Sequence, residues 1–199
     1  MKKMNLVVMI EAAFMAAFAL VLDLLPSIKV TNFVSISFAM VPVLIISLRW
    51  GVKAGVLSGF LWGLLQVAVG DVSILSPIQF IIEYFLAFAC IGFAGVFRPS
   101  VSSALERGHR PKAWFFIALA VLAGSLARYF WHFLAGMIFW GQYAPKSMSP
   151  VIYSLIVNGG TMLGSALLCA VILSVLAGAS SRLFIRKPVS KRSELPISK

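Results

Sequence analysis

Charge is scarce in this chain, and negative charge is the scarcest. Of the 199 residues, 12% are charged and six are Asp or Glu, whereas 61% are hydrophobic. Soluble globular domains carry about 25% charged and about 45–50% apolar residues. These proportions exclude a soluble domain and fit an integral membrane protein. A bilayer core about 30 Å thick needs about 20 apolar residues per helix, so the sequence predicts about six membrane helices in one domain.

Motifs of common enzymes and ATPases are also missing. The chain has no H-E-x-x-H, C-x-x-C or G-x-S-x-G motif, so metal-dependent and serine hydrolases have no support. It has no G-x-x-x-x-G-K-[ST] loop either, so any ATP-driven step would need another chain. Cys90 and Cys169 lie in apolar runs and are expected to be buried thiols. We therefore expect no enzymatic activity, no metal and no cofactor.

The formal charge of +11 is placed on one side of the predicted helices. All but three of the 17 basic residues fall on that side, the exceptions being Lys29, Arg128 and Lys146. Because basic residues concentrate in cytoplasmic loops, both termini and the loop at 98–112 are predicted to be cytoplasmic. This placement argues against a nucleic-acid partner. The N-terminal MKKMN lacks an A-x-A-like cleavage site, so the first apolar segment is expected to be retained.

Hydrophobic runs and helix breakers divide the chain into six predicted helices. Their ranges are residues 5–25, 34–48, from the turn at 49–53 to 70, 77–97, 113–140 and 151–179. Residues 1–182 would form one six-helix membrane domain, and residues 183–199 a basic cytoplasmic tail near anionic lipid. No internal repeat is visible, which makes a secondary transporter built from repeats less favoured.

Small residues form two stripes on the predicted helices. The third helix carries glycines every four residues, on one face: Gly51, Gly55, Gly59 and Gly63. The first helix carries small-xxx-small pairs of alanine: Ala12, Ala13, Ala16, Ala17 and Ala19. Such stripes let membrane helices approach closely. We expect the glycines to pack within the chain, whereas the alanines fit either an internal neighbour or a partner protein.

The stretch from Arg128 to Asn158 gathers polar and aromatic side chains in an apolar setting. Arg128, His132, Gly136 and Trp140 recur every four residues and share one helix face, with a gap at Gly136 that a ring could fill. Polar groups inside lipid cost free energy and usually mark a site. Aromatic faces with a few polar groups suit a flat, cationic small molecule. Alternatively, His132 could be a core histidine bonded to a neighbouring helix.

Glu83, followed by Tyr84, is the one acidic residue that we place in the outer half of a predicted span. A buried carboxylate without a partner is costly. Arg128 or His132 could neutralise it within the protein, or a cationic ligand could do so.

Tyr153 and Asn158 lie near the start of the last predicted helix. Asn158 offers two donors and an acceptor to the polar edge of a heterocycle. Tyr153, together with Tyr143 and Trp140, could instead belong to an aromatic belt at the membrane surface. Both interpretations stay open at this point.

Five sequence blocks resemble one known family. In chain order they are EAAFMAAFALVLDLLP, VPVLIISLRWGVKAGVLSGFLWGLLQ, IIEYFLAFACIGFAGVF, YFWHFLAGMIFWGQYA and YSLIVNG. They resemble the thiamine-specific substrate-binding subunits of energy-coupling-factor (ECF) vitamin transporters over nearly the whole chain. The resemblance implies an all-α, six-helix integral membrane protein with cytoplasmic termini. It further implies capture of thiamine outside and delivery with a transmembrane coupling subunit and two cytoplasmic ATPase subunits.

The resemblance also assigns residues. The thiamine pocket would be lined by Glu83, His132, Trp140, Tyr153 and Asn158, with Tyr84 adjacent and Arg128 on the same helix face as His132. Ala13 and Ala17 would contact the coupling subunit. Phe33 and Ser73 would belong to a lid, where this chain departs from the family pattern: Phe33 stands for a tryptophan, Ser73 for a tyrosine and, nearby, Ser37 for a glutamate. Two alternatives stay open. The chain could be the substrate-binding subunit for another vitamin or a thiamine precursor, or it could be a stand-alone secondary transporter of a cationic heterocycle.

Overall fold

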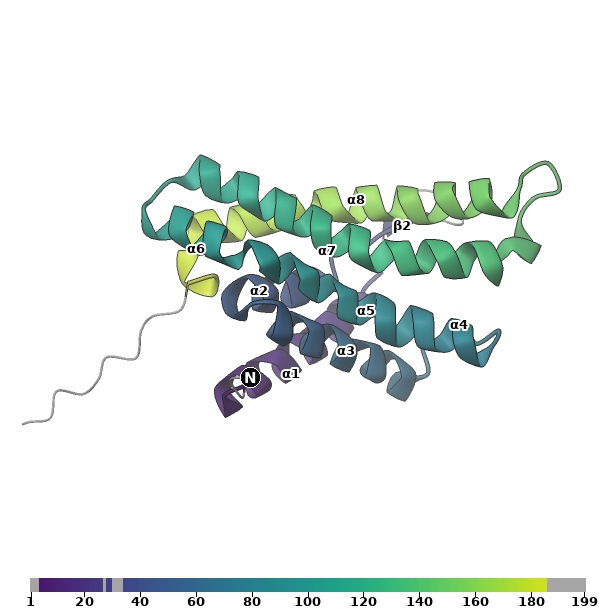
Figure 1. The fold of residues 1–199 in the computed structure, drawn as a ribbon, viewed down its shortest axis with the longest axis horizontal. Helices are drawn as coiled ribbons and strands as arrows, with labels where there is room; N and C mark the ends of the chain where they lie inside the picture. Colours follow the sequence, from purple (N-terminus) through teal and green to yellow (C-terminus); the bar gives the residue numbers. More distant parts are fainter. Residues whose placement is uncertain (1–3, 27, 30–33, 186–199) are drawn as a thin grey trace, which may run out of the picture.

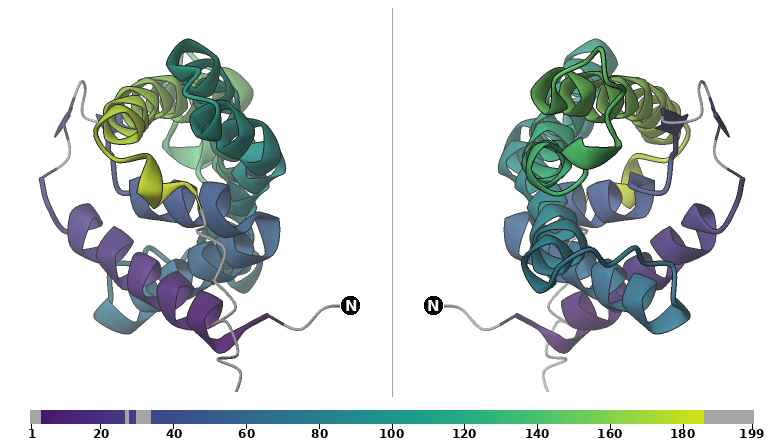
Figure 2. Two further views of the ribbon diagram at one scale, coloured as in Figure 1. Left: turned by 90° about the vertical axis from the view of Figure 1, so that its left-hand side faces the viewer. Right: turned by 90° about the vertical axis from the view of Figure 1, so that its right-hand side faces the viewer.

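The computed structural model describes residues 4–26, 28–29 and 34–185. Its helices run mostly along one axis (Figure 1), and the short helix α2 lies in the middle when they are viewed end-on (Figure 2). Within these described ranges, five helical stretches are long and apolar enough to cross a membrane: α1 (Leu6–Asp23), α3 (Val52–Val69), the run Pro77–Glu106, α7 (Arg110–Ile138) and α8 (Pro150–Ala179).

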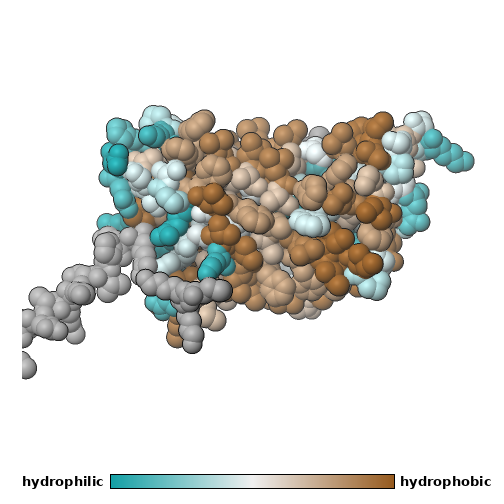
Figure 3. Space-filling model, viewed as in Figure 1, coloured by the Kyte–Doolittle hydropathy of each residue, from teal (hydrophilic) through white to brown (hydrophobic). Residues whose placement is uncertain are grey.

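The surface between the two polar ends of the molecule is apolar (Figure 3). Large apolar side chains face outward there, with Phe14 65% and Leu167 70% exposed. Exposed apolar area of this extent would be unfavourable in water and is typical of a membrane protein. The chain is therefore a helical membrane protein, as its composition predicted.

The prediction of a second helix at 34–48 is wrong for the first half of that range. Ser35–Ile36 (β2) forms a two-residue antiparallel ladder with Ile28–Lys29 (β1), and the helix α2 begins at Val41 and ends at Trp50. Pro42 lies in the first turn of α2, where the missing N–H of proline is tolerated. Ser37 holds the extended segment, because its N–H donates to Ser165 Oγ at 3.1 Å and its Oγ accepts from the N–H of Ala39.

The fourth predicted helix is longer than expected and changes its geometry. The run Pro77–Glu106 comprises α4 (Pro77–Ile81), a π-helical segment (Ile82–Leu86), α5 (Ala87–Cys90), a 3₁₀ segment (Ile91–Phe97) and α6 (Arg98–Glu106). Ser76 caps it, with its Oγ accepting from the N–H of Gln79. The predicted loop at 98–112 is therefore mostly helix. Pro99 does not break the run because α6 starts anew at Arg98, so the proline lies in a first turn.

The last two long helices lie close to their predicted ranges. α7 and α8 are joined by residues 139–149, which include the 3₁₀ turn Gly141–Tyr143. Ser149 caps α8 by accepting from the N–H of Ile152. At the opposite end, α8 is followed by the 3₁₀ turn Ser181–Leu183. Phe184 is fully buried, so the packed part extends to that residue, whereas residues 186–199 of the predicted tail lie outside the described residues.

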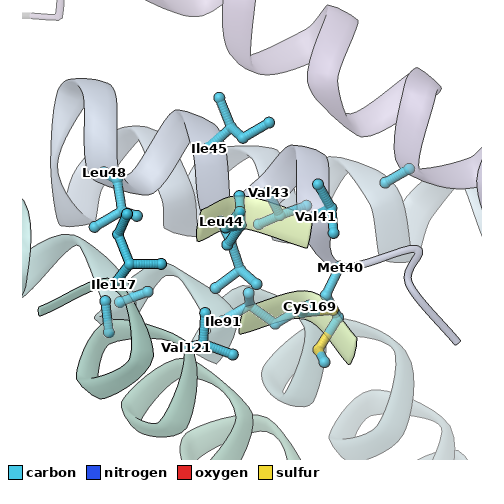
Figure 4. Packing of buried hydrophobic residues seen from close by; sticks show 14 of the residues in the cluster. Met40, Val41, Val43, Leu44, Ile45, Leu48, Ile91, Ile117, Val121 and Cys169 are labelled. Atoms are coloured by element: carbon cyan, nitrogen blue, oxygen red, sulfur yellow. The ribbon is translucent and has the colours of Figure 1, made fainter. Parts of the chain in front are cut away.

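The core centres on α2, where eight of ten residues are buried. Figure 4 shows Leu48 of α2 beside Ile117 of α7, and Leu44 of α2 near Ile91. The glycine stripe of α3 packs within the chain, as predicted: a Cβ at Gly59 would overlap the carbonyl oxygen of Phe88, and one at Gly63 the carbonyl oxygen of Tyr84. The long run Pro77–Glu106 is thereby held directly against the α3 backbone.

Candidate functional site

A cavity of about 220 Å³ lies where α7 ends and α8 begins. We call it the aromatic cavity. Its walls come from the π-helical segment, the end of α7 and the first turns of α8: Glu83, His132, Gly136, Trp140, Tyr153, Ser154, Val157 and Asn158. Five of the predicted pocket residues therefore meet at one place, although they come from three separate parts of the chain.

Glu83 is the one carboxylate in this lining, and two neutral donors hold it. Trp140 donates its indole N–H to Glu83 Oε1 at 2.9 Å, and the amide of Gln79 donates to Glu83 Oε2. Trp140 lies two residues beyond the end of α7, so the chain turn there aims its ring back at the carboxylate. Charge-assisted hydrogen bonds of this kind orient a carboxylate without cancelling its charge.

Glu83 lies in the π-helical segment. Ile82–Leu86 interrupts an otherwise α-helical stretch and contains both Glu83 and Tyr84. π-helical turns inside α-helices are rare and are frequent at functional sites. Here Glu83 lines the cavity, whereas the carbonyl of Tyr84 faces Gly63 of α3.

Gln79 connects Glu83 to the loop at 71–76. The side chain of Gln79 is fully buried; besides Glu83 it donates to the carbonyl of Ser73 at 3.0 Å and accepts from the N–H of Leu75 at 3.0 Å. The N–H of Ser73 donates to the hydroxyl of Tyr84 at 2.8 Å. This loop is thus fastened to the residues on either side of the carboxylate.

α7 and α8 approach each other closely beside the cavity. Ser154 Oγ donates to the carbonyl of Phe133 at 2.8 Å, and Asn158 Nδ2 donates to Ser154 Oγ at 3.1 Å. Gly136 makes this approach possible, since a Cβ there would lie 2.7 Å from Asn158 Nδ2. The missing side chain at Gly136 therefore serves helix packing as well as the cavity that was predicted.

A second cavity, of about 230 Å³, adjoins the first and shares His132 and Asn158 with it. We call it the arginine cavity, because Arg128 lines it. Its other lining residues are Asp23, Ser35, Ser37, Met40, Tyr129 and Thr161. Non-helical backbone at membrane depth is tolerated where it lines a cavity, which accounts for the extended segment before α2.

Arg128 is directed toward aromatic rings. Its guanidinium carbon lies 4.4 Å from the ring centre of Phe88 and 5.0 Å from that of Trp62, and its Nε donates to His132 Nε2 at 3.4 Å. Among the described residues, Glu83 has no ion pair. Neutralisation of Glu83 by Arg128 or His132, one of the two alternatives, is therefore not what these residues do.

Asp23 corrects one sequence-based statement. Glu83 was expected to be the one acidic residue in the outer half of a span, but Asp23 also lies in a long apolar helix, in the last turn of α1. It accepts a hydrogen bond from the amide of Gln66 and faces the arginine cavity. The carboxylate of Asp23 and the guanidinium of Arg128 thus line the same cavity with opposite charges.

The remaining predicted residues are placed as follows. Tyr84 lines neither cavity and instead anchors Ser73, which itself lies in the loop at 71–76. Tyr143 is 56% exposed, as an aromatic belt would require, whereas Trp140 and Tyr153 line the aromatic cavity. Phe33 lies outside the described residues.

Sequence reasoning missed several residues that shape the site. These are Gln79, Asp23, Ser154 and Tyr129. The spacing of Gln79 and Glu83, four residues apart in an apolar helix, was a usable signal for the first of them.

Comparisons with known proteins point in one direction. Residues 9–185 match a family described as "Thiamine transporter protein". The thiamine transporter ThiT of Lacticaseibacillus paracasei is 36% identical over 186 residues, covering 92% of each chain. ThiT of Bacillus subtilis is 39% identical over 181 residues, covering 90% of this chain and 94% of its own. A solved structure of ThiT from Listeria monocytogenes superimposes with a TM-score of 0.87 at 39% identity, covering 91% of this chain and 98% of that one.

Proposed function

Because this chain belongs to the thiamine transporter family, we propose that it binds thiamine in the aromatic cavity and delivers it into the cell as the substrate-binding subunit of an ATP-driven ECF transporter. Its part in thiamine uptake is that of a membrane transport protein, not of an enzyme. The binding site, the ATP-driven coupling and the membrane orientation are the elements that we propose.

The geometry of Glu83 carries the proposed site. A carboxylate that is oriented by Trp140 and Gln79, lacks an ion pair among the described residues and lines a small cavity is suited to a cationic ligand. Thiamine has a positively charged thiazolium ring and an aminopyrimidine ring. Glu83 would oppose the positive charge or accept from the aminopyrimidine.

Aromatic and polar groups around the cavity would complete the recognition of two flat rings. Trp140 would stack on one ring and supply cation–π attraction of about 0.5–2 kcal/mol. His132, Tyr153 and Asn158 would orient the polar edges of the ligand from α7 and α8. Since nanomolar affinity corresponds to about −12 kcal/mol, these contacts must act together with closure of the loops at the site.

The proposed orientation places the aromatic cavity outside and the turn at 107–109 in the cytoplasm. The described basic residues near that turn include Arg107, Arg110 and Lys112, which fits the concentration of positive charge in cytoplasmic loops. With α2 as a short sixth crossing, supplemented by the extended segment before it, both termini would be cytoplasmic. The protein would then be a multi-pass protein of the cell membrane.

Coupling to ATP requires partner subunits, because the sequence has no nucleotide-binding loop. α1 offers a contact surface: Ala12 and Ala16 are fully buried, whereas Ala13 and Ala17 are exposed on another face. Small exposed residues four positions apart allow close approach by another membrane helix. We therefore place the contact with the coupling subunit at Ala13 and Ala17.

The charge of Glu83 is the first property to test. Glu83→Gln keeps the size of the side chain and removes its charge, so thiamine affinity should fall about 30- to 100-fold, or about 2–3 kcal/mol. An analogue with an uncharged ring in place of thiazolium should lose much less. Both affinities are measured by titrating ligand-stripped protein with each compound and recording its tryptophan fluorescence. Equal losses for the two ligands would contradict the proposed role of the charge.

The coupling surface is tested by enlarging it. Ala13→Leu with Ala17→Leu should abolish co-purification with the coupling subunit and ATP-dependent uptake into liposomes, while thiamine binding stays intact. Ala68→Leu, at an exposed alanine of α3, is the control and should change neither. Thiamine uptake by the chain alone, driven by an ion gradient, would instead establish a stand-alone secondary transporter.

A further inference from the structure

A groove lies between α7 and α8, near the end of the molecule opposite the aromatic cavity. It has a volume of about 470 Å³ and its lining is almost entirely apolar, including Trp114, Ala118, Val171, Val175 and Gly178. Trp114 is 43% and Val175 is 65% exposed, so the groove opens onto the apolar surface of the molecule. An open apolar groove at membrane depth is filled by something flexible and apolar.

A polar cavity of about 270 Å³ continues this groove toward the end of the molecule. The two share Gly178, and the polar cavity is lined by Arg110, Gly108 and Ser181 among others. Arg110, Trp114 and Ala118 follow each other at four-residue intervals on α7, so they form one row about 6 Å apart. Along this row the lining changes from cationic to aromatic to apolar.

We propose that this row is a binding site for an anionic phospholipid, with one acyl chain in the apolar groove and the phosphate at Arg110. A guanidinium binds phosphate oxygens through paired N–H donors, and the hydroxyl of Ser181 can add a further donor. Tryptophan is favoured at the depth where headgroups meet acyl chains. The charge of Arg110 selects an anionic lipid over a zwitterionic one.

The site is independent of thiamine binding. The turn between α6 and α7 and the end of α7 lie at opposite ends of the molecule (Figure 1). Variants at the lipid site should therefore keep their thiamine affinity, and this affinity shows that each variant is folded.

Native mass spectrometry of the full chain in detergent tests the proposal. The protein is mixed with equal amounts of phosphatidylglycerol and phosphatidylcholine that carry the same acyl chains. The unchanged protein should retain phosphatidylglycerol over phosphatidylcholine by about fivefold, the ratio expected from one basic residue at an anionic headgroup. Arg110→Gln should bring this ratio close to one.

Gly178→Leu tests the groove itself. A Cβ at Gly178 meets no atom within 4 Å, so leucine would project into the groove without a clash and should reduce binding of both lipids severalfold. Lys112→Gln, whose side chain lines a different cavity beside α6, and Ala68→Leu are the matched controls.

Three results would overturn the proposal. One is equal loss of lipid preference in Arg110→Gln and Lys112→Gln, which would indicate a general effect of charge. Another is unchanged lipid binding in Gly178→Leu. The third is a loss of assembly with the coupling subunit in these variants without loss of lipid, which would make the groove a protein contact.

Discussion

Two helix interfaces lie near Glu83 and differ in the atoms that make contact. In one, α3 packs against the run Pro77–Glu106 through backbone atoms; in the other, α7 packs against α8 through side chains. On one side, α3 lies against the run Pro77–Glu106 with backbone on backbone. A Cβ at Gly59 or Gly63 would overlap a carbonyl oxygen of that run, and one at Gly92 would overlap the N atom of Val56. No side chain separates the two elements at these positions, so there is no room for a ligand.

On the other side, α7 and α8 also approach closely, but the contact is made by side chains. The atoms that a Cβ at Gly136 would meet belong to the side chains of Ser154 and Asn158, not to the backbone. Both aromatic and arginine cavities lie beside this contact. The tight interface, between α3 and the run Pro77–Glu106, thus fixes the backbone that carries Glu83. The side-chain interface, between α7 and α8, leaves a cavity that Glu83 lines.

Gly59→Ala should give the largest effect and distinguish the two interfaces. Because backbone atoms of Phe88 and Ala89 would have to move, we expect the free energy of unfolding to fall by about 3 kcal/mol, at the upper end for overpacking. Gly159→Ala in α8, where a Cβ meets nothing within 4 Å, should be neutral or slightly stabilising. Thermal unfolding in detergent measures both, and similar values for the two variants would refute the tight interface.

The same substitution at Gly136 should affect binding more than stability. The Cβ of alanine there would overlap Ser154 Oγ and Asn158 Nδ2, so both side chains must shift, which changes the wall of the aromatic cavity. We expect thiamine affinity to fall about tenfold, equivalent to about 1.4 kcal/mol, and stability to change by about 1 kcal/mol or less. Thiamine titration and thermal unfolding of one preparation give both numbers. A large loss of stability with unchanged affinity would show that α7 and α8 pack like the tight interface.

Helical periodicity predicted that the glycines of α3 pack within the chain and that the cavity residues of α7 share a face; it did not show which elements they face. Glycines four residues apart in α3 share a face, and so do Arg128, His132 and Gly136 in α7. These patterns are local and survive without knowledge of the partner helix. Trp140 is a partial exception, since it lies beyond the end of α7 and still reaches the cavity.

The parts that sequence reasoning missed depend on contacts between distant segments. The extended segment before α2 is held by Ser165 of α8, which no local pattern reveals. The sequence places Asp23 near the end of a predicted helix, but it does not show that Arg128 and Tyr129 line the same cavity. The π-helical segment that contains Glu83 was likewise not predicted from the composition of the chain.

The smallest predicted effect concerns Gln79, whose side chain connects Glu83 of the aromatic cavity to the loop at 71–76. Gln79→Met keeps the length of the side chain but removes the donor to Glu83 and both bonds to the loop at 71–76. Ser73 and Leu75 are exposed, so water can replace their lost partner, and stability should change little. Glu83 would keep Trp140 as its donor but become less well oriented. Thiamine affinity should therefore fall about fivefold, equivalent to about 1 kcal/mol for one hydrogen bond.

Gln142→Met provides the control for this change, because Gln142 is exposed and donates to the carbonyl of Phe139 in the loop next to the cavity. Its thiamine affinity should stay within about twofold of the unchanged protein, as for most exposed substitutions. If Gln79→Met also bound thiamine normally, Trp140 alone would orient Glu83, and the loop at 71–76 would be independent of the carboxylate. If it bound more weakly and also unfolded more easily, Gln79 would belong to the rigid packing against α3. A loss of affinity at constant stability is the result that assigns Gln79 to the binding site.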